Sequence, residues 1–324
     1  MNTRRLLLAT FGLLVAAATP VWAQTFPDKP VKVVMPYPAG TGPDAVMRYV
    51  GERLSKTWGQ PLLVDNKPGG NGWIGLDAVK RSAPDGYTFL MIDQAIMSLH
   101  PHLYKKMPVN TGKDFEAVAP MYSTNYFVTV APNSKWKSFT DLVNDAKTRG
   151  KPLTYGSSGV GGQLHIGGAL TEAAAGIPMT HVPYKDIAQL YVDISEGNVD
   201  FAFATAATAG PLLKAGKVKF LAYAAPKRNP RYPDVPTVAE AGGPADLQVS
   251  TWMALFAPAG VPAAVKSKVN ADVTRIISAP ETQEFLANIG FSAWPGSAKD
   301  LADTMARDGA GYSEFVKRFK LSLD

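Results

Sequence analysis

The sequence predicts an α/β protein of two lobes, each a mostly parallel sheet flanked by helices. Short β-rich runs such as residues 31–35 alternate with helical patterns, as where Val46 and Val50 recur at helical spacing. Repeated strand–helix–strand units indicate parallel strands that are covered by helices on both faces. Two such sheets suit a chain of 324 residues better than one sheet does.

The predicted elements follow one another at short intervals. β-Branched and aromatic residues predict the strands, while helical spacing, or Ser138 with Asp141 three residues later as a capping pair, predicts the helices. The predicted strands are 31–35, 61–64, 87–92, 126–131, 153–155, 179–182, 199–204 and 249–257. The predicted helices begin at residue 44, cover 73–80, begin after Ser138, and cover 163–175.

Two of these strands, 126–131 and 249–257, are long and apolar and are predicted to cross between the lobes. The first lobe is then discontinuous, made of residues 24–124 and 249–324. The second lobe holds the residues between them, 125–248.

The N-terminus has the pattern of a secretory signal peptide. Arg4 and Arg5 form a positive segment, and the apolar run 6–18 is shorter than the about 20 residues that span a bilayer. Small residues for cleavage follow at 21–23. We therefore expect residues 1–23 to be a signal peptide and the mature protein to be periplasmic. The alternative is a membrane anchor.

Composition and charge exclude several classes of protein. The chain has no cysteine, so neither a disulfide nor a lipid-modified cysteine is expected. The net charge of +6 is not gathered into basic runs longer than two residues, which argues against nucleic acid as a partner. His100 and His102 form the only close histidine pair, and Asp114 is the first acid after them, so neither a metal nor a cofactor is expected.

Two glycine-rich loops are the candidate ligand sites. Residues 36–44 (PYPAGTGPD) and 155–163 (YGSSGVGGQ) each connect a strand to a helix, one in each predicted lobe. Open α/β sheets bind ligands at such places, because free backbone N–H groups and the helix dipole attract an anion. The alternative is that both loops are only tight connections.

These loops lack the motifs of nucleotide binding and serine hydrolysis. Gln163 follows Gly162 where a Walker loop has lysine, and Leu164 stands where the dinucleotide motif has its last glycine. The segment 156–160 ends in valine, so it is not a nucleophile elbow. Recognition of an anion by neutral donors remains, which suits a carrier better than a catalyst.

Three polar side chains near the loops have alternative interpretations. Asp44 opens a helix, where it complements the dipole, holds the loop, or meets a ligand amine or water. His165 lies in the first turn of the second helix and either donates to the ligand or caps the turn. His181 lies within a strand and is interpreted as a core histidine whose hydrogen bonds are satisfied.

Short motifs in a fixed order identify a family. They are 37–40 (YPAG), 66–70 (NKPGG), 83–87 (APDGY), 103–106 (LYKK), 155–159 (YGSSG), 181–185 (HVPYK) and 233–242 (PDVPTVAEAG). In this order they resemble the Bug family, the substrate-binding proteins of tripartite tricarboxylate transporters, over essentially the whole mature chain. The resemblance implies a two-lobed periplasmic binding protein fold of type II, which closes on a carboxylate ligand.

The resemblance also implies that the two loops grip one ligand carboxylate through backbone amides and bridging waters. The corresponding residues are Ala39, Gly40, Thr41 and Asp44 in the first loop, and Ser158, Gly161, Gly162, Gln163 and His165 in the second. Thr41 and Pro43 depart from the usual family sequence, which puts the water network in doubt.

The rest of the cleft must recognise the far end of the ligand. Tyr37 and Tyr184 either stack on a flat ligand or pack within the fold. Where many similar proteins have an aspartate, this chain has Ala204, Thr205 and Ala206, which disfavours a ligand ammonium. A second carboxylate could meet Lys185 or Thr205, so the first candidate ligand is an aromatic dicarboxylate such as terephthalate.

We therefore expect a monomeric solute-binding protein, not an enzyme, that delivers an organic carboxylate to the permease subunits of a membrane transporter. One alternative is a secreted hydrolase acting on carboxylates, against which the missing nucleophile elbow and the four histidines count. The other is a protein that presents its ligand to a sensor, which the sequence does not separate from transport.

Overall fold

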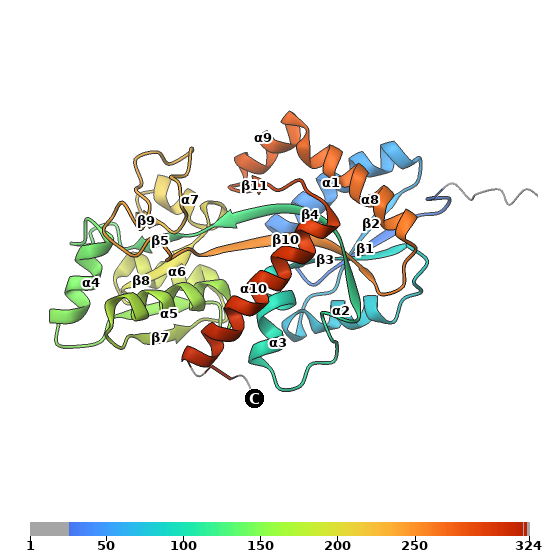
Figure 1. Cartoon of the computed structure of the whole chain (residues 1–324). Coiled ribbons are helices and arrows are strands. Elements are labelled where there is room, and N and C mark those ends of the chain that lie inside the picture. The colour runs from blue at the N-terminus through green and yellow to red at the C-terminus, as the bar shows by residue number, and fades with distance from the viewer. Residues whose placement is uncertain (1–25, 320, 323–324) are drawn as a thin grey trace, which may run out of the picture.

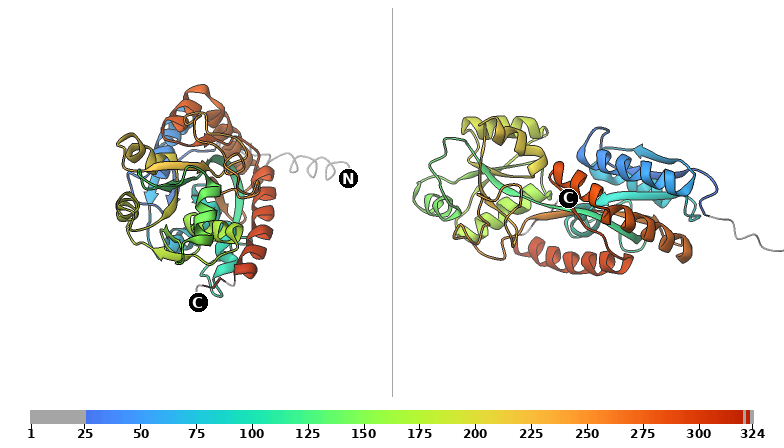
Figure 2. Two further views of the ribbon diagram at one scale, coloured as in Figure 1. Left: turned by 90° about the vertical axis from the view of Figure 1, so that its left-hand side faces the viewer. Right: turned by 90° about the horizontal axis from the view of Figure 1, so that it is seen from above.

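The computed structural model describes residues 26–319 and 321–322, which form two lobes. Each lobe is built on one β-sheet with helices packed on its faces, and the two lobes lie side by side along an elongated molecule (Figures 1 and 2). This confirms the predicted two-lobed α/β class. The predicted signal peptide, residues 1–23, lies outside the described residues.

The first sheet takes its strands from both ends of the chain, in the order β11-β4-β10-β3-β1-β2. The strands are β1 (Val31–Met35), β2 (Leu62–Asn66), β3 (Thr88–Asp93), β4 (Phe115–Asn125), β10 (Ser250–Pro258) and β11 (Ser292–Ala293). The helices of this part are α1 (Gly42–Trp58), α2 (Trp73–Lys80), α3 (His100–Leu103), α8 (Ala263–Ser278) and α9 (Pro280–Asn288), with the short segments η1 (Gly70–Gly72) and η2 (Ala95–Leu99).

The second sheet is formed by one continuous stretch of chain, in the order β7-β6-β8-β5-β9. The strands are β5 (Phe127–Val130), β6 (Thr154–Ser157), β7 (Thr180–Pro183), β8 (Phe201–Ala204) and β9 (Lys219–Tyr223). The helices are α4 (Phe139–Thr148), α5 (Gln163–Ala175), α6 (Ile187–Glu196) and α7 (Ala206–Lys214). We propose that the lobes divide after residue 124 and before residue 249. β4 and β10 belong to the first sheet, and β5 to β9, which lie between them in the chain, form the second.

Both sheets are mixed rather than mostly parallel. β1 pairs in parallel with β2 and β3, and β6 pairs in parallel with β7 and β8. β10 is antiparallel to β3 and β4, and β5 is antiparallel to β8 and β9. β5 and β10 are the strands that enter each sheet directly from the other lobe, so no helical crossover turns them parallel to their neighbours.

The chain passes between the sheets twice, at adjacent places. β4 leads into β5 through Tyr126, and Val249 leads back into β10; the Tyr126 N–H donates to the Val249 carbonyl over 3.0 Å. The predicted crossing segments 126–131 and 249–257 begin at these junctions, but 127–130 lie entirely within the second sheet. The long strand that reaches the first junction is β4, which the sequence pattern does not predict.

α1 shows how the apolar pattern of the sequence becomes core. Val46, Val50 and Leu54 are fully buried in the same cluster as Met35 and Phe89, and each such side chain contributes about 1.5–3 kcal/mol. This packing holds the N-terminus of α1 at the carboxyl end of β1, where the first glycine-rich loop lies.

The C-terminal helix α10 (Ala298–Phe319) lies across the junction of the lobes (Figure 1). Near its end Val316 packs in one cluster with Leu99 and Leu103 of the first lobe and Ile166 of α5. The helix therefore contacts both lobes. Within the described residues, no helix is both long and apolar enough to cross a membrane.

Candidate ligand-binding cleft

A cleft of about 380 Å³ lies between the two lobes, a size typical of small-ligand sites. From the side of the first sheet it is lined by Tyr37, Gly42, Pro43, Asp93, Ala95, Tyr122, Thr124, Thr251, Met253 and Phe291. From the side of the second sheet it is lined by Tyr126, Ser158, Gly162, Gln163, Leu164, Thr205, Ala207 and Thr208.

Three helices point their N-termini at this cleft. Its lining includes the first residues of α1 (Gly42) and α5 (Gln163), and the cap Thr205 and second residue Ala207 of α7. The amides of a first helical turn have no partner within the helix, and the dipole makes that end positive. The cleft is therefore suited to an anion, as the two glycine-rich loops predict.

The caps of these helices leave backbone donors for a ligand. Gly162 has no side chain to cap α5, and Thr41 does not cap α1, because its hydroxyl donates to the Pro38 carbonyl over 2.8 Å. At α7 the Thr205 hydroxyl accepts the Thr208 N–H over 3.2 Å. The N-termini of α1 and α5 thus offer amides that no side-chain cap occupies.

The first loop is held by a buried carboxylate. Asp44, 3 % exposed, accepts hydrogen bonds of 2.9 Å each from the Gly40 N–H, the Arg48 Nε and the Asn66 Nδ2. Burial tends to raise the pKa of Asp44, but these bonds outweigh it and lower the pKa to about 2. Asp44 does not line the cleft; it shapes the loop that does.

The second loop is held by a neutral imidazole. His165, 5 % exposed, accepts the Gly161 N–H on Nδ1 over 3.1 Å, and its ring stacks on that of His181 at 4.2 Å. Burial, with a smaller contribution from His181, lowers the pKa of His165 to about 4. His181 in turn lies 2.6 Å from the Ser157 hydroxyl. The geometry favours the turn-capping interpretation of His165, and His181 has the hydrogen-bond partner expected of it.

The floor of the cleft carries an acid and three tyrosines. Asp93 ends β3; its Oδ2 accepts the Tyr37 hydroxyl over 2.6 Å and its Oδ1 accepts the Ile96 N–H over 3.0 Å. Tyr122 and Tyr126 complete this wall. Burial first, and then the charge of Asp93, raise the pKa of all three tyrosines, so they stay neutral. Among the described lining residues there is no lysine, arginine or histidine.

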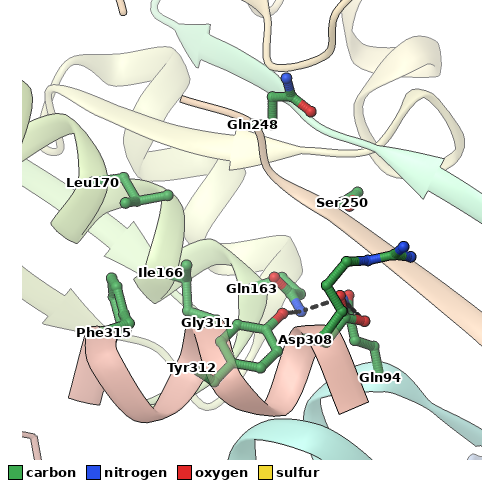
Figure 3. Close-up of a pocket in the computed structure, with 11 residues that line it drawn as sticks. Gln94, Gln163, Ile166, Leu170, Gln248, Ser250, Asp308, Gly311, Tyr312 and Phe315 are labelled. Carbon is green, nitrogen blue, oxygen red and sulfur yellow. Dashed lines mark hydrogen bonds between the residues drawn. The ribbon is translucent and has the colours of Figure 1, made fainter. Parts of the chain in front are cut away.

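Two further hollows adjoin the cleft. One of about 590 Å³ is lined by Gly40 and Thr41 of the first loop and by Arg231 and Asn288, which are bonded across the lobes over 2.8 Å. The other, of about 290 Å³, lies beside α10 (Figure 3). The 380 Å³ cleft differs from both, because the N-termini of α1, α5 and α7 all line it, whereas only those of α1 and α7 line the 590 Å³ hollow.

Gln163 connects the cleft with α10. Its Nε2 donates to the Tyr312 hydroxyl over 3.0 Å, as Figure 3 shows, and lies 3.4 Å from the Gln94 side-chain oxygen. Gln94 and Trp252 of the first lobe both donate to Asp308 of α10, over 2.7 and 2.8 Å. The side chain of Gln163 thus joins the two lobes, while its backbone lies at the start of α5.

The structure brings only part of the predicted site together. Tyr37, Ser158, Gly162, Gln163 and Thr205 line the cleft, and Gly40 and Thr41 line the adjoining hollow. Ala39, Asp44, Gly161, His165 and Tyr184 line neither, and Asp44, Gly161 and His165 act within the loops. The Tyr184 hydroxyl donates to Asp193 over 2.6 Å. Lys185 also lies outside the cleft lining.

Sequence reasoning missed the floor of the cleft, above all Asp93, Tyr122 and Tyr126. Asp93 follows the buried strand run 88–92, and a polar residue at the carboxyl end of a parallel strand is a usable signal. Tyr122 and Tyr126 carry no such signal, since they reach the cleft only through the long strand β4 and the junction after it.

A two-lobed α/β molecule whose interlobe cleft is lined by helix N-termini defines the class of ligand-binding receptors. The profile of the tripartite tricarboxylate transporter family receptors, TctC, matches residues 46–320, and this chain belongs to that family. Family members are periplasmic receptors, not enzymes, that bind small carboxylates and work with transporter permeases. Membership decides against the hydrolase alternative. The described residues contain no group of three or more His, Asp or Glu placed to hold a metal.

Individual relatives agree in fold and in sequence. BugT of Bordetella pertussis is 29% identical over 294 residues, which cover 90% of each chain. The structure of R. palustris Rpa4515 with adipate is 29% identical, with a TM-score of 0.82 over 92% of this chain and 100% of that one. MatC from Rhodopseudomonas palustris with bound malate is 28% identical, with a TM-score of 0.77 over 90% and 100%.

Proposed function

We propose that this protein captures one organic carboxylate between its lobes and delivers it to the permease subunits of a tripartite transporter. The observation that carries the proposal is the meeting of three helix N-termini, those of α1, α5 and α7, at a cleft whose described lining has no cationic side chain. A carboxylate bound there is held by amides and dipoles, which bind without reacting. The adipate and malate named with two related structures support a carboxylate ligand.

The remaining finer predictions are part of the same proposal. We propose that residues 1–23 direct the chain to the periplasm and that the mature protein acts as a monomer. The ring of Tyr37 and the stacked pair Tyr122–Phe291, with ring centroids 4.6 Å apart, line the cleft and favour a flat ligand. The candidate terephthalate needs Lys185 or Thr205 as the partner of its second carboxylate, and of these only Thr205 lines the cleft.

The test adds one negative charge at the helix N-termini. Ala207 is exposed in the first turn of α7 and lines the cleft. An aspartate there suits the helix dipole, so A207D should keep its thermal stability while losing carboxylate binding at least about tenfold. A207N, of the same size but neutral, is the matched control and should bind nearly as the natural chain does.

The measurement is thermal shift followed by calorimetry with mono-, di- and tricarboxylates, each with and without EDTA. A ligand at a hundredfold excess over Kd should stabilise the natural chain by about 2.7 kcal/mol. Absence of any stabilising acid, loss of binding with EDTA, or equal binding by A207D and A207N would contradict the proposal.

A further inference from the structure

Asp93 is the one carboxylate among the cleft-lining residues, and no cation neutralises it. Within the described residues it takes part in no ion pair, in contrast to Asp44 with Arg48. Its two hydrogen bonds, from Tyr37 and from the Ile96 N–H, come from neutral groups. Each oxygen keeps a free lone pair, and Asp93 is only half-buried, so the carboxylate can accept further donors from the cleft.

The groups around Asp93 do not supply the missing charge. Tyr37, Tyr122 and Tyr126 face it and are neutral, because burial raises their pKa. His100 of α3 is close enough to feel its charge, but burial lowers the pKa of His100, so the imidazole is uncharged at neutral pH. A carboxylate that lines a cleft without a counter-ion is therefore a candidate binding group for a cation.

Tyr122 gives an independent indication. It is 2 % exposed, it lines the same cleft, and its hydroxyl oxygen is buried without any hydrogen-bond partner. A buried hydroxyl is nearly always paired in a folded protein, so an unpaired one on the wall of a cleft points to a ligand atom. Tyr122 and Asp93 both line the cleft, and the charge of Asp93 contributes to the raised pKa of Tyr122.

We propose that the ligand is a carboxylate that also carries a cationic nitrogen, which binds between Asp93 and the Tyr122 hydroxyl. This inference rests on the proposed function, which places the ligand carboxylate at the helix N-termini. The nitrogen donates to Asp93 and to Tyr122, and the faces of the surrounding tyrosine rings attract its charge. A second carboxylate at this place would meet the unpaired Asp93, so the inference replaces terephthalate as the first candidate.

The inference also revises a step of the sequence reasoning. The segment 204–206 lacks the aspartate that many similar proteins have, which disfavours an ammonium at that place. Asp93 supplies a carboxylate from a different strand, at the end of β3. In this chain the acidic partner of a ligand cation is therefore Asp93, in place of the aspartate that many similar proteins have in the segment corresponding to 204–206.

The test uses three acids of one shape that differ in charge at the far end. These are 4-(aminomethyl)benzoate, which is cationic there, 4-(hydroxymethyl)benzoate, which is neutral, and terephthalate, which is anionic. Calorimetry with the natural chain should give the cationic acid a Kd at least about tenfold below that of terephthalate. The pair 5-aminopentanoate and glutarate repeats the comparison with flexible chains.

Two variants test whether Asp93 and Tyr122 cause the preference for the cationic acid over terephthalate. D93N keeps an acceptor for Tyr37 and should remove most of the tenfold preference for the cationic acid. Y122F loses no hydrogen bond of the free protein, so it should fold normally. It should weaken the binding of 4-(aminomethyl)benzoate and 5-aminopentanoate several-fold more than the binding of the dicarboxylates. D85N, at the exposed Asp85 just before β3 and thus at the end of that strand opposite to Asp93, is the control and should leave all ratios unchanged.

The outcomes separate this inference from the proposed function. Tighter binding of terephthalate or of the hydroxymethyl acid than of the amino acid, or an unchanged ratio in D93N, overturns the inference and leaves the carboxylate receptor intact. If none of the five acids binds and the wider acid screen also fails, both are overturned.

Discussion

The two loops of the cleft are built alike but held by different chemistry. In each loop a glycine with φ of +81° precedes the helix cap, and its N–H donates to the third residue of the helix. In the first lobe the pair is Gly40 with the carboxylate of Asp44, and in the second it is Gly161 with the imidazole of His165. Both pairs fix the backbone just before the helix N-terminus that lines the cleft.

The difference shows that the geometry requires an acceptor, not a charge. Asp44 brings a negative charge close to a site for anions; Arg48 compensates that charge, and Asn66 donates a hydrogen bond to it. His165 needs no such partner, because burial keeps it neutral. The second loop therefore places no negative charge beside the positive end of its helix, whereas the first loop does so and depends on Arg48 to offset it.

The largest expected effect comes from removing the charged acceptor. Asp44→Ala leaves the Gly40 N–H without its acceptor and takes one hydrogen-bond partner each from Arg48 and Asn66, so it should lower the free energy of unfolding by about 3 kcal/mol. Urea unfolding measures this effect. Asp65→Ala is the control, since Asp65 forms looser ion pairs of 3.5 and 3.9 Å at the surface, and it should change stability by less than about 0.5 kcal/mol. Equal losses in both variants would show that Asp44 is not the loop's support.

The second effect is a different pH dependence of the two loops. The folded pKa of His165, about 4, lies below the usual 6.5, so its contribution is complete above pH 6.5 and is lost as the pH falls toward 4. The contribution of Asp44 is complete above about pH 4 and is lost toward pH 2.

Unfolding free energies measured from pH 7 to pH 3 test this order. In H165Q the fall in unfolding free energy between pH 6.5 and pH 4 should be smaller by about 2 kcal/mol than in the natural chain. D44N should change the pH dependence of the unfolding free energy only below about pH 4. If H165Q has the same slope as the natural chain in the upper range, the imidazole of His165 is not the group that titrates.

The smallest expected effect concerns the two glycines. Gly40→Ala and Gly161→Ala each force a side chain into the left-handed region and should destabilise the protein by about 1 kcal/mol, and by similar amounts. Gly311→Ala, in the exposed interior of α10 with open space around it, should instead stabilise by about 0.5–1 kcal/mol. Thermal unfolding of the three variants checks this, and a clear inequality between Gly40 and Gly161 would break the likeness of the loops.

Local rules predict the loops and their helices well. The helices 73–80 and 163–175 have the predicted bounds, and the capping pair of Ser138 and Asp141 forms as expected. Such features depend on neighbours within a few residues, which the sequence displays directly.

The parts that depend on distant pairing are not predicted. β4 contains Pro120 and no clear alternation, and it is a strand because β10 lies beside it. The cleft floor follows from that pairing, since Asp93 pairs with Met253 in the same sheet and Tyr122 lies across from Met253 on β4. A single sequence contains no record of which strand lies next to which.

The place of β10 in the first sheet also sets an order of folding. The second sheet is complete once residue 223 has been made, because its five strands follow one another without interruption. The first sheet has β10 between β3 and β4, so in the proposed export its centre stays open until residues 250–258 have crossed the membrane. As the chain emerges into the periplasm from its N-terminus, the middle of the chain can therefore fold while the earlier N-terminal strands still wait for their central partner.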